Sequence, residues 1–146
     1  MKLLAIDPAT LSGWATEDAY GTWNLATRAN ESDGIKWLRF KAQLAEIVDL
    51  ANITVIVYER PAGRHTNAVI HHAKLVAIIE ELCAERDIEY KGYSSSEIKK
   101  HATGKGNANK AAMVEAAKQQ LDYMGEDDNE ADALWLYELA SADLGI

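Results

Sequence analysis

Apolar residues along this chain form short unbroken runs that alternate with longer periodic stretches. The unbroken runs, bounded by turn-forming residues, predict strands, because a strand that is buried on both faces has no polar side. We expect strands at 2–7, 13–16, 21–25, 53–58 and near 88–90. A short turn at about 17–21 would join the second and third of them as a hairpin.

The longer stretches, with apolar residues every three or four positions, predict amphipathic helices. They lie at 34–51, 67–86, 109–121 and 129–140. A further short helix should begin after Ser94 and run through His101, because Ser94 and Glu97 have the spacing of a capping box. Three strands followed by alternating helices and strands predict a single α/β domain over 1–146 with a mixed sheet.

Composition is that of an ordinary globular domain, since 48% of the 146 residues are apolar and 26% are charged. The one cysteine, Cys83, cannot form an internal disulfide and has apolar neighbours. We therefore expect it in the core of a protein of the reducing cytoplasm. No apolar stretch approaches the roughly 18 residues that a membrane-spanning helix needs, so we expect no membrane association.

Charge is distributed unevenly along the chain. The net charge of −8 argues against a general polyanion binder, because phosphate affinity comes mainly from lysine and arginine. Lysines nevertheless gather in the segment 91–118, whereas acids crowd 126–143. We therefore expect a polarised surface with a basic region that the net charge conceals.

Two of the predicted strands end on a carboxylate. Asp7 closes the run 2–7, and Glu59 directly follows 53–58. A charge at the end of a buried strand is unfavourable unless an opposite charge pairs with it. We therefore expect Asp7 and Glu59 to share a cation.

A third acidic feature marks the start of the last predicted helix. Asp128 and Asp132 are four residues apart and therefore lie on one face of that helix. Acids in a first helical turn also cap free amides and complement the helix dipole, and we favour that role for Glu126, Asp127 and Glu130. Asp132 has apolar neighbours on both sides, so we expect it to point partly inward and to belong to the site.

Three or four carboxylates without histidine or cysteine suit Mg²⁺ or Mn²⁺ rather than zinc. Such a site can hold two ions about 4 Å apart, one activating water and one stabilising the leaving oxygen in phosphodiester hydrolysis. We favour this role over a structural cation, because a domain of this size with a good core does not need one.

Four motifs follow one another along the chain. They occupy residues 4–8 with 12–15, 57–61, 93–99 with 104–110, and 130–134. In order and spacing they resemble the opening motif, the second acidic motif, the basic helix–loop–helix segment and the closing acidic helix of the RuvC-type Holliday-junction resolvases, members of the ribonuclease H-like superfamily. Each motif is short, so the resemblance depends on their succession from residue 2 to about 140.

The resemblance implies a ribonuclease H-like fold, an α/β domain with a mixed five-stranded sheet flanked by helices. It also implies a Mg²⁺-dependent endonuclease that resolves four-way junctions or other branched DNA with two metal ions per site and leaves a 5′-phosphate. Symmetric cutting of a junction needs two sites, so a homodimer is implied, with the helix at 67–86 as a plausible contact surface.

The resemblance carries Asp7, Glu59 and Asp132 over as catalytic, metal-binding residues. The family commonly has a further aspartate three residues before the last one, and this chain has Asn129 there. Asp128, one residue earlier, is our provisional fourth ligand. The choice between Asp128 and Asn129 stays open at the level of sequence.

Basic residues give the candidate DNA contacts. Lys99 and Lys110 fall where the family keeps lysines that contact DNA or support catalysis. Lysines on an exposed helix are often only solvated, but on an otherwise acidic protein these two indicate a phosphate-binding region, to which Lys105 can be added. Arg60 and Arg64 follow the second acidic motif and could touch DNA near the scissile bond.

Two other functions remain open. A non-catalytic module of the same fold that binds branched DNA or protein is favoured by Asn129 and by the overall acidity. A ribonuclease H-like nuclease with another target, such as flap DNA or RNA in a hybrid, is the second. His65, beside Arg64, could also touch DNA, whereas His101 is more simply an exposed loop residue.

Overall fold

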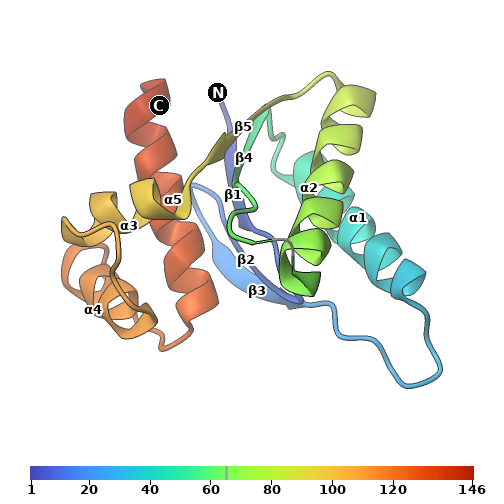
Figure 1. Ribbon diagram of the computed structural model, residues 1–146. Helices are drawn as coiled ribbons and strands as arrows, with labels where there is room; N and C mark the ends of the chain where they lie inside the picture. Colours follow the sequence, from blue (N-terminus) through green and yellow to red (C-terminus); the bar gives the residue numbers. More distant parts are fainter. Residues whose placement is uncertain (65) are drawn as a thin grey trace.

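A mixed sheet of five strands forms the middle layer of the protein (Figure 1). The computed structural model describes residues 1–64 and 66–146, so the predicted DNA contact of His65 lies outside the described residues. In order across the sheet the strands are β3 (Tyr20–Asn24), β2 (Leu11–Ala15), β1 (Leu3–Asp7), β4 (Val55–Glu59) and β5 (Glu89–Tyr93). β1, β4 and β5 are parallel, and β2 runs antiparallel to both β1 and β3, which confirms the predicted hairpin.

Helices cover both faces of this sheet (Figure 1). The first face carries α1 (Asp33–Leu50) and α2 (Asn67–Arg86), and the second carries α5 (Asp128–Leu144) with α3 (Ser95–Thr103) and α4 (Lys110–Gln120) packed beside it. The mixed five-stranded sheet between two helical layers confirms the predicted α/β fold class. None of the described helices is long and apolar enough to cross a membrane.

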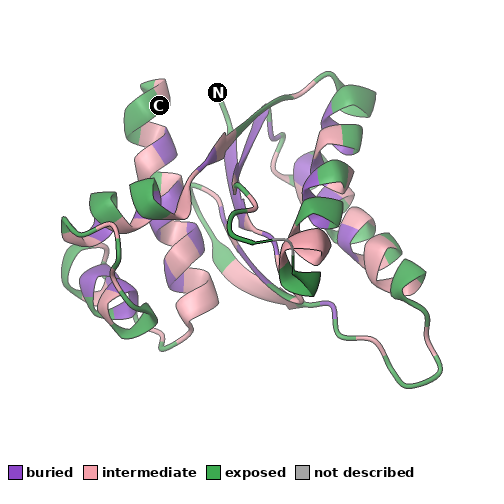
Figure 2. Ribbon diagram, in the orientation of Figure 1, coloured by how far each residue is buried: buried purple, intermediate pink, exposed green. Residues whose placement is uncertain are grey.

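Side chains of β1 and β4 alternate between two separate cores. Figure 2 shows buried positions along these strands and along the helices on both sides of the sheet. The residues that face the α3–α5 layer have odd numbers: Leu3, Ala5, Val55 and Val57. Those that face α1 and α2 have even numbers: Leu4, Ile6, Ile56 and Tyr58. Because successive side chains of a strand point to opposite faces, Asp7 and Glu59 are directed to the α3–α5 side.

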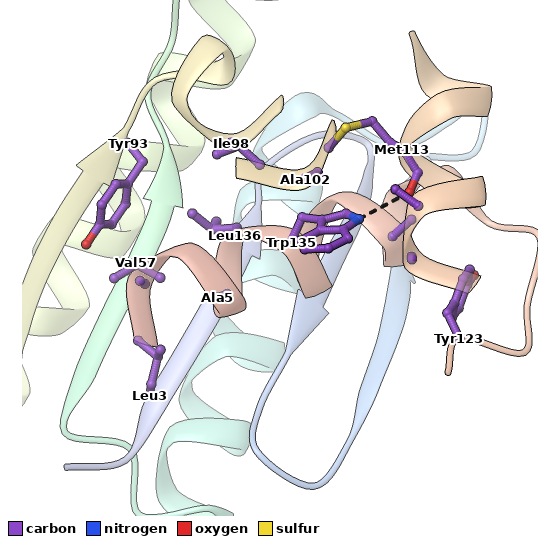
Figure 3. Close-up of a cluster of buried hydrophobic side chains, with 14 of the residues drawn as sticks. Leu3, Ala5, Val57, Tyr93, Ile98, Ala102, Met113, Tyr123, Trp135 and Leu136 are labelled. Carbon is purple, nitrogen blue, oxygen red and sulfur yellow. Dashed lines mark hydrogen bonds between the residues drawn. The ribbon is translucent and has the colours of Figure 1, made fainter. Parts of the chain in front are cut away.

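The core on the α3–α5 side fixes the position of α5. Trp135 is buried, and its indole N–H donates a hydrogen bond of 3.2 Å to the carbonyl oxygen of Met113 in α4 (Figure 3). Leu136, the next residue of α5, belongs to the same buried cluster as Ala5 and Val57 of the sheet. The helix that carries Asp128 and Asp132 is therefore anchored to both α4 and the sheet.

The helix starts follow the predicted local signals, but α3 ends at Thr103 rather than at His101, and α5 also ends later than predicted. The Ser94 hydroxyl accepts a hydrogen bond of 3.1 Å from the Glu97 amide, and the Glu97 carboxylate accepts one of 3.0 Å from the Ser94 amide, so the capping box is confirmed. α5 begins at Asp128 and continues to Leu144, beyond the predicted end at 140. The extension occurs because Leu144 packs against the buried cluster.

We expect Ile56→Ala to lower the free energy of unfolding by about 2–5 kcal/mol, because the side chain is fully buried in β4 and its removal leaves a cavity. Urea unfolding followed by circular dichroism measures the change. Leu38→Ala is the matched control, since Leu38 is 65% exposed on α1 and should change stability by less than about 0.5 kcal/mol. Equal effects of the two substitutions would contradict the placement of β4 between two cores.

Candidate active site

Asp7 and Glu59 end two neighbouring parallel strands. β1 and β4 pair with Ile6 opposite Tyr58, so the next residue of each strand lies beside the other at the edge of the sheet. The alternation along both strands directs Asp7 and Glu59 toward α5. Both residues are half-buried, and their carboxylates therefore lie close to apolar surroundings.

Asp128 and Asp132 reach the same place from the first turns of α5. They lie four residues apart on the helix, and both are half-buried. The Asp7 carboxylate is close enough to both for their charges to repel its own. The structure therefore places the four predicted acids near one another, at the ends of β1 and β4 and at the start of α5.

The surroundings of these acids disfavour their charged forms. Burial raises the pKa of Asp7 well above its ordinary value, and repulsion from neighbouring acids, Glu59 foremost, adds to the increase. Burial, with repulsion from Glu59 and Asp128, raises the pKa of Asp132 to about 7. Burial also raises the pKa of Glu59. A group of carboxylates under this penalty is suited to receive added positive charge.

Two lysines at the rim supply part of that charge. The Nζ atom of Lys110, the first residue of α4, lies 3.6 Å from Oδ2 of Asp128. Lys99, on α3, acts against the increase in the pKa of Glu59. Both lysines also act to lower the pKa of Asp132, which stays raised nonetheless. The lysines therefore compensate only part of the negative charge.

A cleft of about 340 Å³ opens among these groups. Its wall includes the carboxylates of Glu59 and Asp132 and the side chains of Lys99 and Lys110. These groups come from β4, α5, α3 and α4, so the cleft lies where the sheet and the second helical layer meet. It therefore joins acids that can hold a cation to lysines that can contact a phosphate.

The donor set fits a hard divalent cation in its chemistry, because it offers carboxylate oxygens under strong mutual repulsion. Among the residues that the structure describes, no three acidic, histidine or cysteine side chains converge closely enough to hold a metal ion as they stand. The carboxylates would therefore have to draw together around a cation. Relief of their repulsion would favour that movement.

The first turn of α5 separates the roles of three successive residues. Asp127 is the N-cap, and its Oδ1 atom accepts hydrogen bonds from the backbone amide of Asn129 at 2.9 Å and from its Nδ2 atom at 3.0 Å. The Asn129 side chain is thus engaged with the cap. Asp128, in contrast, contributes its charge to the environment of Asp7 and of Asp132. Asp128 therefore lies near the other acids, while the Nδ2 atom of Asn129 serves the cap.

The remaining acids near this helix start have local partners. Glu126 forms an ion pair with Lys118 of α4. Glu130 accepts a hydrogen bond of 2.7 Å from the Tyr123 hydroxyl. Asp127 caps the helix as predicted, whereas Glu126 and Glu130 are held by these other local partners.

The other predicted DNA contacts lie in exposed segments around the cleft. Arg60 and Arg64 are exposed in the segment between β4 and α2, and Lys105 is exposed in the loop between α3 and α4. The Arg60 backbone amide donates a hydrogen bond of 2.8 Å to the carbonyl oxygen of Tyr93. The Arg60 side chain also donates a hydrogen bond of 3.5 Å to the carbonyl oxygen of Gly92, so the start of this segment is held against the end of β5.

Sequence reasoning missed one residue that supports the end of β4. The Nε2 atom of His72, on α2, lies 2.8 Å from the backbone carbonyl oxygen of Glu59. Burial lowers the pKa of His72, which favours a neutral ring that donates this hydrogen bond. The sequence signal that could have identified His72 is its position in the second turn of the helix after β4, because that turn lies near the end of the strand.

Comparisons with known proteins bear on the fold. No family model matches the chain, and no curated protein matches it in sequence. Solved structures do match, among them Thermus thermophilus RuvC, with a TM-score of 0.78 at 17% identity over 99% of this chain and 97% of that one. T. thermophilus RuvC in complex with a Holliday junction substrate gives 0.79 at 17% identity over 99% and 96%.

The yeast mitochondrial Holliday junction resolvase Ydc2 is also similar, with a TM-score of 0.62 at 14% identity over 94% of this chain and 76% of that one. These similarities extend over nearly the whole chain. The resemblance inferred from the motifs is thus confirmed at the level of fold: the protein has the ribonuclease H-like fold of the RuvC resolvases.

Proposed function

We propose that the protein is a metal-dependent endonuclease that resolves Holliday junctions or other branched DNA. The observation that carries this proposal is a cleft lined by Glu59, Asp132, Lys99 and Lys110. Asp7 and Asp128 lie close enough to these groups to interact with their charges. The fold supports it, because solved structures with the same fold include a resolvase bound to a junction substrate.

Asp7, Glu59, Asp128 and Asp132 would hold two Mg²⁺ ions, with Mn²⁺ as a substitute. Bound there, the ions would supply activation of water and stabilisation of the leaving oxygen, with hydrolysis giving a 5′-phosphate and a 3′-hydroxyl. The charges of the other three acids all act on Asp7, so we assign it a central part among the residues that would hold the ions. Neutralisation of the negative charge would allow the four side chains to draw together.

Lysines and arginines around the cleft would bind the DNA backbone. Lys99 and Lys110 line the cleft and would contact phosphates near the scissile bond, with Lys105, Arg60 and Arg64 further out. Recognition would then rest on backbone charge and on the shape of the junction rather than on base sequence. We further propose a homodimer that presents two sites to one junction, with α2 as a contact surface.

The proposal is tested by cleavage of labelled four-way junction, flap, duplex and RNA–DNA hybrid substrates in Mg²⁺, in Mn²⁺ and in EDTA. We expect metal-dependent cleavage with a preference for the four-way junction. A preference for flap or hybrid substrates would keep the chemistry and change the target. Metal-independent cleavage would contradict the role of the carboxylates.

The second candidate is a non-catalytic module of the same fold that binds branched DNA or protein. Asn129, at a position where the resolvases commonly have an aspartate, favours it, as does the net charge of −8. The same assay distinguishes the two functions, because the module would bind the junction and leave it uncut in every metal.

Lys110→Ala should weaken junction binding about threefold to tenfold and lower the slope of log Kd against log salt by about 0.9, because one phosphate contact is lost. Fluorescence anisotropy across a salt series measures both. Lys2→Ala is the matched control, since Lys2 precedes β1 and therefore lies at the end of the sheet away from Asp7. Equal salt slopes for wild type and Lys110→Ala would exclude the phosphate contact.

A further inference from the structure

The separation between the sheet acids and the helix acids depends on how closely α5 approaches the sheet. Asp7 is fixed at the end of β1, whereas Asp128 and Asp132 move with the first turns of α5. α5 contacts β2 and β3 as well as β1. The β2–β3 hairpin, which contributes no carboxylate to the site, is therefore in a position to set this separation.

Gly13 permits a close approach of the hairpin to α5. It lies directly opposite Asp7 in the β1–β2 pairing. A Cβ atom at Gly13 would lie 2.5 Å from the carbonyl carbon of Asn129 and deep inside the contact distance of its oxygen. These are backbone atoms, so no change of rotamer could relieve the clash. Any larger residue at position 13 therefore requires β2 and the first turn of α5 to move apart, which displaces the acids of that turn relative to the sheet.

Thr22 holds the same turn from the neighbouring strand. It lies opposite Gly13 in the β2–β3 pairing, so Asp7, Gly13 and Thr22 form one row across three strands. The Thr22 hydroxyl donates a hydrogen bond of 2.8 Å to Oδ2 of Asp127, the N-cap of α5. The other oxygen of Asp127 accepts from Asn129, so the cap links the hairpin to the helix.

We propose that Gly13 and Thr22 are positioning residues that set the separation between Asp7 and the acids of α5, and thereby the affinity of the site for divalent metal. Gly13 sets how near the helix can come, and Thr22 fixes its cap at that distance. The expected effect of these residues on cleavage rests on the proposed function. Their expected effect on metal affinity does not require the protein to be a nuclease.

The test uses the full chain with Gly13→Ala, Thr22→Val and the conservative Thr22→Ser. Mn²⁺ affinity is measured without DNA, from the free-ion signal in electron paramagnetic resonance. We expect Mn²⁺ affinity to fall at least about tenfold for Gly13→Ala and about threefold to tenfold for Thr22→Val, since displacements of about 1 Å have large effects on such sites. Thr22→Ser keeps the hydroxyl, and its affinity should stay within about twofold of wild type. Gly34→Ala is the control, because a Cβ there meets only the Ser32 hydroxyl at 3.5 Å.

Cleavage at saturating Mn²⁺ should fall about 100-fold for Gly13→Ala, while junction binding in EDTA stays within about threefold, because the lysines of α3 and α4 are untouched. Unchanged Mn²⁺ affinity in folded Gly13→Ala, or equal affinity in Thr22→Val and Thr22→Ser, would overturn the inference. If circular dichroism shows Gly13→Ala unfolded, the two Thr22 variants decide. A wild type that binds Mn²⁺ with this pattern but cuts no substrate would overturn the proposed function and leave the positioning role standing.

Discussion

Asp7→Asn should reduce cleavage of a four-way junction by at least about 10³-fold while leaving binding of the junction intact. Asp7 is the carboxylate on which the charges of Glu59, Asp132 and Asp128 all act. Asparagine keeps the size of the side chain and removes its charge, so the fold and the basic surface persist. Single-turnover cleavage in Mg²⁺ and anisotropy in EDTA measure the two quantities.

Although Asp7→Asn should reduce cleavage, we expect it to increase the stability of the fold. An acid whose pKa is higher in the folded state than in the unfolded state weakens folding at neutral pH, and a neutral residue removes that penalty. The melting temperature of Asp7→Asn in EDTA should therefore rise. Glu46→Gln, on the exposed side of α1, is the control and should change neither cleavage nor melting. Wild-type cleavage by Asp7→Asn would rule out the proposed mechanism.

Asp128→Asn should lower cleavage about 100-fold or more, whereas Asn129→Ala should lower it less than about fivefold. The Asp128 carboxylate lies beside Lys110 and acts on Asp7. The Asn129 side chain instead donates to the cap, and the cap keeps the bond from the Asn129 backbone amide when that side chain is removed. Single-turnover rates across a Mn²⁺ series measure the difference.

The comparison between these two variants decides the fourth ligand. A larger loss for Asn129→Ala than for Asp128→Asn would assign the metal-binding role to Asn129. Because both residues lie in the same helical turn, a general disturbance of α5 would lower cleavage similarly in both variants. The circular dichroism spectrum of each variant should match that of wild type.

Much of the fold and half of the site could be predicted from local sequence. Unbroken apolar runs located β1 and β4, and the carboxylate at the end of each run located Asp7 and Glu59. These features are local, since each depends on a few successive residues. The capping box of Ser94 and Glu97 was predictable for the same reason and is present.

The arrangement around α5 was not predictable, because it depends on contacts between distant segments. The hydrogen bond from Thr22 to Asp127 joins residues 105 positions apart. The approach of Gly13 to the helix backbone likewise has no local signal beyond the glycine itself. The direction of the Asn129 side chain follows from the cap, and the sequence alone left the fourth ligand open between Asp128 and Asn129.

The alternation of β1 and β4 between two cores restricts how the lengths of these strands can change. Deleting or inserting one residue before Asp7 would exchange the side chains that enter the two cores and turn the carboxylate toward α1 and α2. A change of two residues would keep the carboxylate on the correct side and move it about 7 Å along the strand. Proteins descended from a common ancestor with this site should therefore tolerate loops of different lengths around β1 and β4, but keep the number of residues within each strand.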